Sequence, residues 1–455
     1  MPEQFVYKYG TAGFRYDAGS MSHVAKRMAH VLAEYASKSY PLAVGLMFTA
    51  SHNPVNDNGI KMIGPDGLMA PSEWESLAEL IVNSTSFDGA IPFDSNQKGT
   101  VIIGRDTRPS GPQLISEFKG ELARHYPNIR LLDLDLVTTP QLHFVVKQYN
   151  QIGDIEAASS NYFRLHEHLV GGLLVNAGND HGKIMIDCAN GVGAVTMRKL
   201  IDLNPKLGNI FQLVNTEGCV NSGCGSDHVK TTGRSPLILG EDDHNSQGAS
   251  FDGDADRIVF WYGGEDGTFK VLDGDKIAAL WAVYFARLHG AESTAVVQTA
   301  YANGASRDFL SLNRVKCVRA KTGVKNLHAM AEHLQINEGY KTVIYFESNG
   351  HGTVLSDTNL HVNECTGDAI SDLLFTVNVL QKLGYGRSIR EWDRNMYTDR
   401  PCTLTKIPVK DRSKFVSDDG DEGGDTRSPR GIAIKDRDHC IQIPARKSLC
   451  QTLWH

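Results

Sequence analysis

The 455-residue sequence has no long apolar run and no cluster of basic residues. A membrane-spanning helix needs about 20 consecutive apolar residues, so we expect no membrane partner. Lysine and arginine number 46 against 53 aspartates and glutamates, and the net charge of −7 leaves no positive footprint for nucleic acid. The first residues lack the basic start and apolar run of a secretory signal. These absences predict a cytoplasmic protein that binds neither membrane nor nucleic acid.

Cysteine is also too scattered to form a zinc motif. The eight cysteines include one close pair, Cys219 and Cys224, but no second close pair follows it. We therefore expect reduced thiols. The hydrophobic fraction of 41% and charged fraction of 22% are ordinary for a globular protein. A length of 455 residues exceeds one hydrophobic core and predicts three or four domains.

Two short segments carry the candidate chemistry. Residues 49–54 read Thr-Ala-Ser-His-Asn-Pro, and residues 252–257 read Asp-Gly-Asp-Ala-Asp-Arg. Alone, the first segment is usually a turn. The second resembles a calcium loop, but the EF-hand spacing fails because Arg257 and an apolar run follow. Three carboxylates at alternate positions suit a hard cation such as Mg²⁺, and a phosphorylated Ser51 would supply the reacting group. Together they predict a phosphoryl-transfer site.

With these segments the sequence resembles the α-D-phosphohexomutases, a family whose active site combines a phosphoserine loop with an aspartate metal loop. Further stretches carry the same resemblance: residues 9–15, 103–110, 138–142, 187–191, 298–304, 321–325, 346–352 and 367–372. The likeness continues to about Asp411. Residues 347–351 read Glu-Ser-Asn-Gly-His, and the asparagine resembles the branch of the family that acts on N-acetylglucosamine phosphates.

Apolar runs alternate with helical patterns, as in βαβ units. We expect strands at residues 42–48, 101–104, 183–187, 248–251, 295–299 and 342–346. Functional segments follow several of these strands, where open α/β sheets bind ligands. The resemblance implies three similar α/β domains with mixed sheets around a central cleft, plus a truncated fourth domain. The predicted domains span residues 1–155, 156–267, 268–395 and 396–455.

The resemblance also implies a reaction. A mutase of this branch interconverts N-acetylglucosamine 6-phosphate and 1-phosphate for UDP-N-acetylglucosamine synthesis. Phosphorylated Ser51 would pass its phosphoryl group to the sugar phosphate, and a sugar bisphosphate would be both intermediate and activator. One Mg²⁺ per active site would be held by Asp252, Asp254, Asp256 and an oxygen on Ser51.

Several basic residues are candidates around this centre. His52 and Lys61 are the expected proton handlers; the alternatives are that His52 only orients its loop and that Lys61 is only a phosphate counter-ion. Arg15 and Arg105 are expected to contact phosphoryl oxygens, because the guanidinium fork suits tetrahedral oxyanions.

Two further arginines lie within the quoted motifs. Arg257 would add positive charge beside the metal loop. For Arg108 we favour a solvated surface ion pair.

Sugar recognition is expected from Glu347, Ser348 and Asn349, whose carboxylate, hydroxyl and amide groups can bind adjacent sugar hydroxyls. Lys321 is a further substrate-binding candidate. Thr11, in a glycine-rich turn, resembles the family's loop near the active serine.

One part of the family pattern is missing. After Tyr397 no segment resembles the Arg-Pro-Ser-Gly-Thr-Glu loop that grips the substrate's non-transferring phosphate in these enzymes. Residues 418–425 are instead acidic and glycine-rich, a composition typical of flexible chain. Two alternatives therefore stand: phosphoglucomutase or phosphomannomutase specificity, and a catalytically impaired remnant. For the chain as written we expect a large drop in mutase activity.

Overall fold

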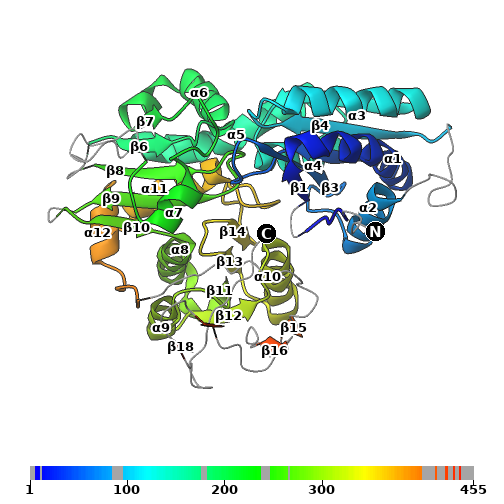
Figure 1. Ribbon diagram of the computed structural model, residues 1–455. Helices are drawn as coiled ribbons and strands as arrows, with labels where there is room; N and C mark the ends of the chain where they lie inside the picture. The colour runs from blue at the N-terminus through cyan, green and yellow to red at the C-terminus, as the bar shows by residue number, and fades with distance from the viewer. Residues whose placement is uncertain are drawn as a thin grey trace. The chain divides into compact units, whose positions relative to one another are not determined.

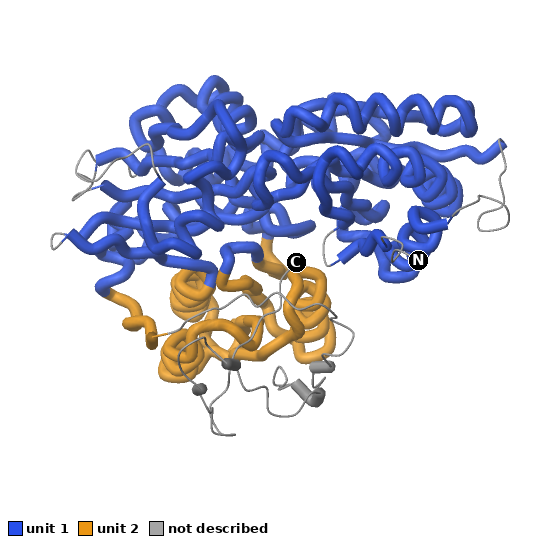
Figure 2. Tube along the Cα trace, viewed as in Figure 1, with its two compact units in different colours: residues 1–274, 349–353, 359–394 blue, residues 275–348, 354–358, 395–455 orange. Residues whose placement is uncertain are grey.

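The computed structural model describes residues 6–10, 13–84, 96–175, 182–236, 246–264 and 267–401, and four short strands beyond them. The chain divides into two compact units (Figure 2). Unit 1 comprises residues 1–274, 349–353 and 359–394, and unit 2 comprises residues 275–348, 354–358 and 395–455. In the described residues, no helix has the length and apolar character needed to cross a membrane.

The first sheet of unit 1 has the strand order β1-β3-β2-β4-β5. Figure 1 labels β1, β3 and β4 of this sheet. Its strands are β1 (Phe14–Asp17), β2 (Ala43–Phe48), β3 (Asp57–Ile63), β4 (Gly99–Arg105) and β5 (Ile129–Leu136). Strands β2, β4 and β5 are parallel, whereas β3 and β1 are antiparallel to their neighbours. The sheet is therefore mixed.

Helices cover both faces of this sheet. They are α1 (Met21–Ser39), α2 (Ser72–Asn83), α3 (Gly111–His125) and α4 (Thr139–Ile152), with the short helix η1 (Ala18–Ser20) before α1. Along β2, Val44, Leu46 and Phe48 join the core that includes α1 and α3. Ala43 and Met47 join the core beneath α4. Burial on both faces explains why β2 reads as a continuous apolar run.

The second sheet of unit 1 has the strand order β10-β9-β8-β6-β7. Its strands are β6 (Ile184–Asp187), β7 (Phe211–Val214), β8 (Gln247–Phe251), β9 (Ile258–Gly263) and β10 (Phe269–Leu272). The accompanying helices are α5 (Ile155–Val175), α6 (Gly193–Leu203), η2 (Pro205–Asn209), α7 (Ser226–Thr232), α11 (Ala369–Lys382) and α12 (Ile389–Arg394). Strands β6, β7 and β8 are parallel, and β9 and β10 continue the sheet in antiparallel fashion.

Unit 2 contains a third sheet with the order β12-β11-β13-β14. The strands are β11 (Thr294–Thr299), β12 (Lys316–Ala320), β13 (Thr342–Phe346) and β14 (Gly352–Ser356), and the helices are α8 (Gly274–His289), η4 (Ala291–Ser293), α9 (Gly304–Leu312) and α10 (Val324–Glu338). Short strands follow at β15 (Val416–Ser417), β16 (Thr426–Ser428), β17 (Ile434–Lys435) and β18 (Cys440–Ile441).

The predicted α/β class with three sheets is confirmed, and each of the six predicted strands is present within a few residues of its expected limits. The acidic stretch at residues 418–425 lies outside the described residues. The limits of the four predicted domains stay a prediction. Cys188, Cys219, Cys224, Cys317 and Cys365 form no disulfide.

Candidate active site

Two loops of unit 1 meet at the candidate site, and each follows the carboxyl end of a strand. Ser51 lies after β2, and Asp252 comes directly after β8. The Ser51 Oγ donates a hydrogen bond of 2.7 Å to Asp252 Oδ2, and both residues are fully buried. Ser51 has φ of 52°, in the left-handed region, which is uncommon for a residue other than glycine. Such backbone strain is typical of functional loops.

The three aspartates of the second loop converge. One carboxylate oxygen from each of Asp252, Asp254 and Asp256 lies within 4.8 Å of the others, and all three side chains are buried. Asp254 Oδ1 and Asp256 Oδ1 accept no hydrogen bond from the described residues. Burial, together with the charges of Asp256 and Asp254, raises the pKa of Asp252 well above its usual value. These carboxylate oxygens are clustered and buried, and some of them accept no hydrogen bond from the described part of the chain, so they are suitable ligands for a hard divalent cation. Such a cation would offset the repulsion between the three negative charges.

Lys61, on β3, pairs with this loop. Its Nζ donates to Asp254 Oδ2 at 2.8 Å and to Asp256 Oδ2 at 3.0 Å. Burial alone would lower the pKa of Lys61, but the two carboxylates outweigh burial and raise it. The Lys61 side chain is therefore a charged ammonium.

His52 has the opposite character. Burial, followed by the charges of Arg257 and Arg15, lowers the pKa of His52 well below 6.5. Its Nδ1 is buried and has no hydrogen-bond partner among the described residues. The site thus combines a neutral imidazole and a charged ammonium around Ser51.

Arg108 fixes the backbone of the loop that contains Ser51. Its guanidinium donates to the carbonyl oxygens of Ser51 at 2.9 Å and Asn53 at 2.7 Å, and its Nε pairs with Asp106 Oδ2 at 3.0 Å. Arg108 has no exposed surface, so the prediction of a solvated surface pair is wrong. A buried guanidinium needs several oxygen acceptors, and the strained loop supplies them through its carbonyl groups.

Sequence reasoning gave no role to two other residues of the site. Asn221 Nδ2 donates to the same two carbonyls, of Ser51 at 2.8 Å and Asn53 at 3.0 Å. Thr139 Oγ1 donates to Asp254 Oδ2 at 2.6 Å. Thr139 stands within a stretch that resembles the family, so its position was a signal that could have been used. Asn221 stands in no distinctive pattern.

Arg257 and Arg15 share the electrostatic environment of the aspartates, whereas Arg105 pairs with a different carboxylate. Arg257 Nε lies 3.8 Å from both Asp252 Oδ2 and Asp256 Oδ1. The pKa of Arg15 is lowered by burial and by the nearby charge of Arg257, which places Arg15 in the same electrostatic environment. Arg105 instead pairs with Asp135 at the end of β5, its Nε donating at 2.8 Å.

The predicted sugar loop follows β13 in unit 2. Glu347 is buried, and its Oε1 accepts hydrogen bonds from the Gly323 amide at 3.0 Å and the Tyr301 hydroxyl at 3.3 Å. Ser348 Oγ donates to Asp275 Oδ2 at 2.8 Å. Both side chains are therefore held in fixed positions.

The remaining candidates differ in their surroundings. Asn349, in unit 1, accepts a 2.9 Å hydrogen bond from the His351 amide through Oδ1. Lys321 is exposed on unit 2. Thr11 lies outside the described residues.

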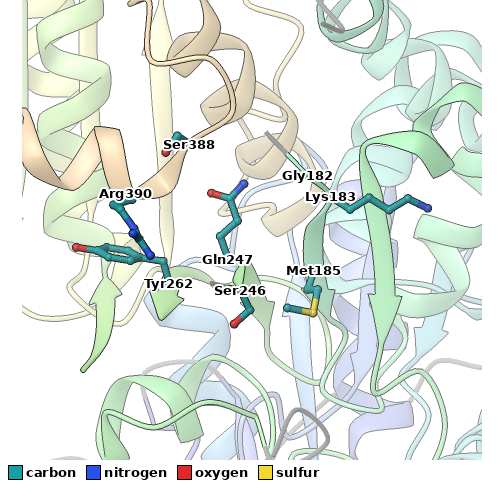
Figure 3. A pocket seen from close by; sticks show the side chains of 8 residues that line it. All are labelled: Gly182, Lys183, Met185, Ser246, Gln247, Tyr262, Ser388 and Arg390. Carbon is teal, nitrogen blue, oxygen red and sulfur yellow. The ribbon is translucent and has the colours of Figure 1, made fainter. Parts of the chain in front are cut away.

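Unit 1 also contains a hollow of about 440 Å³ beside β8 and α12 (Figure 3). Its polar side chains hold α12 in place: Gln247 bonds the backbone at Arg387 and Ile389, and Arg390 donates to the Gly263 carbonyl. None of the candidate site residues lines this hollow.

Family models match the chain in three parts. Residues 10–89 and 90–162 match domain I of phosphoglucomutase/phosphomannomutase, an α/β/α domain. Residues 166–259 match domain II, and residues 273–362 match domain III, of phosphoacetylglucosamine mutase AMG1.

The chain is similar to several proteins that are named as phosphoacetylglucosamine mutases. A phosphoacetylglucosamine mutase from Sus scrofa is 35% identical over 467 residues, covering 92% of this chain and 84% of the relative. A crystal structure of Aspergillus fumigatus N-acetylphosphoglucosamine mutase with GlcNAc-6P and magnesium has a TM-score of 0.83 and 32% identity, covering 94% of this chain and 86% of that one. A serine-to-alanine variant of the Aspergillus fumigatus enzyme, in complex with glucose 1,6-bisphosphate, has a TM-score of 0.83 and 31% identity over the same shares.

Proposed function

The chain belongs to the phosphoacetylglucosamine mutase family, and from this membership we propose that it interconverts N-acetylglucosamine 6-phosphate and N-acetylglucosamine 1-phosphate. The homologues are isomerases of the phosphohexomutase superfamily. The observation that carries the proposal is the 2.7 Å hydrogen bond between Ser51 Oγ and Asp252 within a buried triad of carboxylates. This arrangement suits metal-assisted phosphoryl transfer at a serine.

The proposed reaction is a two-step relay. In the first step the bond between phosphorus and Ser51 Oγ breaks, and the phosphoryl group forms a bond to the free hydroxyl of the sugar monophosphate. The product is a sugar bisphosphate. In the second step the bond between phosphorus and the sugar oxygen at the other position breaks, that phosphoryl group forms a bond to Ser51 Oγ, and the isomeric sugar monophosphate is released. A Mg²⁺ ion held by Asp252, Asp254, Asp256 and a Ser51 phosphate oxygen would neutralise the charge that develops on the transferring group.

Protons need a donor and an acceptor in each step. The sugar hydroxyl loses a proton as it attacks, and the acceptor that we propose is the imidazole of His52. The Ser51 oxygen gains a proton as it leaves, and the donor that we propose is the Lys61 ammonium. Arg15 and Arg257 would bind the phosphoryl oxygens, because their guanidinium groups share the electrostatic environment of the aspartates. For Arg105 we propose a phosphate contact that would require it to leave Asp135.

Substrate recognition is proposed for Glu347, Ser348, Asn349 and Lys321, with Thr11 beside the serine loop. The fixed positions of Glu347 and Ser348 support this role, since a held carboxylate binds hydroxyls without losing side-chain entropy. A relative's structure contains GlcNAc-6P and magnesium, and another contains glucose 1,6-bisphosphate. We propose that this chain binds the same sugar phosphates and magnesium. We also propose that its product enters UDP-N-acetylglucosamine synthesis and that the protein is cytoplasmic. The proposed domain limits lie near residues 155, 267 and 395.

Turnover of N-acetylglucosamine 6-phosphate with Mg²⁺ and a trace of sugar bisphosphate tests the proposal, with glucose and mannose phosphates as competing substrates. Preference for the N-acetylated sugar supports the assigned specificity; preference for glucose or mannose phosphate contradicts it. The sequence lacks the family's Arg-Pro-Ser-Gly-Thr-Glu loop. We therefore expect turnover well below that of a relative with the loop, because an unheld phosphate loses the advantage of orientation. Turnover equal to such a relative's would show that the loop is dispensable.

A further inference from the structure

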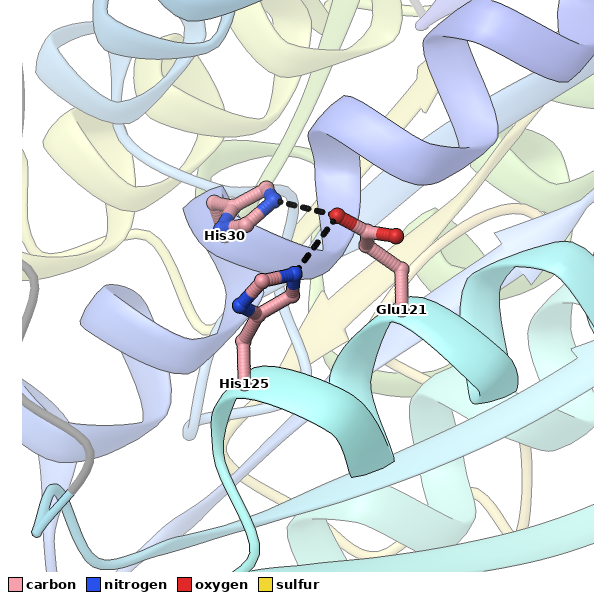
Figure 4. Close-up of side chains that lie close together, drawn as sticks. All are labelled: His30, Glu121 and His125. Carbon is pink, nitrogen blue, oxygen red and sulfur yellow. Dashed lines mark hydrogen bonds and ion pairs between the residues drawn. The ribbon is translucent and has the colours of Figure 1, made fainter. Parts of the chain in front are cut away.

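A second cluster of possible metal ligands lies between two helices of unit 1. His30 projects from α1, and Glu121 and His125 project from α3 (Figure 4). His30 Nε2 lies 3.1 Å from Glu121 Oε1, and His125 Nε2 lies 3.2 Å from the same oxygen. All three ligand atoms lie within 4.8 Å of one another. None of the three residues belongs to the proposed mutase site.

Two of the three separations between these atoms are compatible with a coordination sphere. In a tetrahedral zinc site with metal–ligand bonds of about 2.0–2.1 Å, neighbouring ligand atoms lie about 3.3 Å apart. The observed separations of 3.1 and 3.2 Å are close to that value. The two imidazoles and the carboxylate therefore already lie close enough together to act on one cation.

The protons of the cluster must be rearranged before a metal can bind. Glu121, as a carboxylate, can only accept hydrogen bonds from the two imidazoles, so metal binding requires the proton on each ring to move to Nδ1. For His30 that proton has an acceptor, because the Tyr126 hydroxyl lies 3.0 Å from His30 Nδ1.

We propose that His30, Glu121 and His125 bind one borderline divalent cation of the Zn²⁺ class and thereby link α1 to α3. Two imidazole nitrogens and one carboxylate oxygen favour Zn²⁺ or Co²⁺ over Mg²⁺, which prefers the all-oxygen aspartate loop. Water would complete the coordination, since Glu121 and His125 keep 20% and 30% of their side-chain surface exposed. The Arg27 charge acts on both His30 and Glu121 and would weaken the site without abolishing it.

The test is a titration of the full chain, saturated with Mg²⁺, with Zn²⁺ by calorimetry and with Co²⁺ by visible absorption. We expect one Zn²⁺ per chain, a d–d absorption band from Co²⁺ and a rise in Tm with Zn²⁺. The variant His125→Ala, at a partly exposed position, should lose at least tenfold in affinity, and Glu121→Gln should lose the Tm rise. The matched control His333→Ala removes an exposed histidine that faces Glu338 at 4.0 Å on α10 and should bind as the parent does.

Two outcomes would overturn the proposal. One is the absence of stoichiometric Zn²⁺ binding in the Mg²⁺-saturated protein, which would leave the three residues as a hydrogen-bonded cluster only. The other is binding that His125→Ala leaves unchanged. A further variant, Asp254→Asn, separates the two sites: Zn²⁺ binding that disappears there but survives in His125→Ala would assign the ion to the aspartate loop.

Discussion

At the residue scale, Arg108 shows how the backbone around Ser51 is held. Its guanidinium and the Asn221 amide together occupy the carbonyl oxygens of Ser51 and Asn53. These contacts fix a loop whose central serine has a left-handed backbone conformation. We infer that Arg108 positions the serine and does not itself touch the reacting atoms.

The variant Arg108→Lys should lower both stability and turnover. Lysine cannot reproduce the fork, so buried carbonyls lose their donors, and we expect a loss of about 3 kcal/mol in unfolding free energy. Urea unfolding measures this loss, and kcat should fall at least tenfold. The matched control Asn221→Ala leaves Arg108 in place and should cost about 1 kcal/mol. Equal effects of the two variants would contradict a leading role for Arg108.

Lys61 should influence metal affinity and turnover in opposite directions. Its ammonium neutralises Asp254 and Asp256 through their Oδ2 atoms, so it competes with a cation for the negative charge of the same two carboxylates. In Lys61→Ala we expect Mg²⁺ to bind about tenfold more tightly, in line with one lost charge-assisted interaction. We expect turnover to fall because the variant lacks the proposed proton donor. Calorimetry and steady-state kinetics check the two effects. Mg²⁺ binding that weakens in the variant would refute this competition.

At the element scale, helix α4 contributes a pH-dependent contact. His143 on α4 is buried, and its Nδ1 lies 2.7 Å from the Gly67 carbonyl. Burial lowers the pKa of His143 to about 4. The folded state therefore favours the neutral ring, so its contribution is fully present above pH ~6.5 and is lost as pH falls towards 4.

The pH dependence of unfolding tests this contribution. Between pH 6.5 and 4 the unfolding free energy should fall by about 3 kcal/mol on account of His143. In His143→Asn, whose amide can still donate to the Gly67 carbonyl, that part of the pH dependence should disappear. The difference between the two proteins isolates the histidine from the other titrating groups. Parallel pH profiles would show that His143 does not titrate in this range.

The elements that sequence predicts well are those defined by local pattern. The apolar run before Ser51 predicts β2, because every residue of that strand is buried on one face or the other. Arg108 was misjudged because its partners are carbonyls of a loop more than 50 residues away in sequence. His30 contacts Glu121 because α1 packs against α3. The two residues are 91 positions apart in the sequence, so no local pattern predicts their contact.

At the scale of the whole molecule, the proposed reaction uses residues from both units of the chain. The serine and aspartate loops both belong to unit 1, whereas Glu347 and Ser348 belong to unit 2. In the proposed relay, phosphoryl exchange at Ser51 would depend on the first set, and full turnover would depend on both sets and on residues that bind the second phosphate. The two activities can therefore be measured separately.

Transfer of labelled phosphate from a sugar bisphosphate to the protein tests the central claim most directly. We predict Mg²⁺-dependent labelling at Ser51, approaching one phosphate per chain, even if net mutase turnover is low. Ser51→Ala should remain unlabelled, and Asp254→Asn should label slowly because a carboxylate of the metal loop is lost. Labelling that persists in Ser51→Ala, or a parent protein that takes up no label with Mg²⁺ present, would contradict the account.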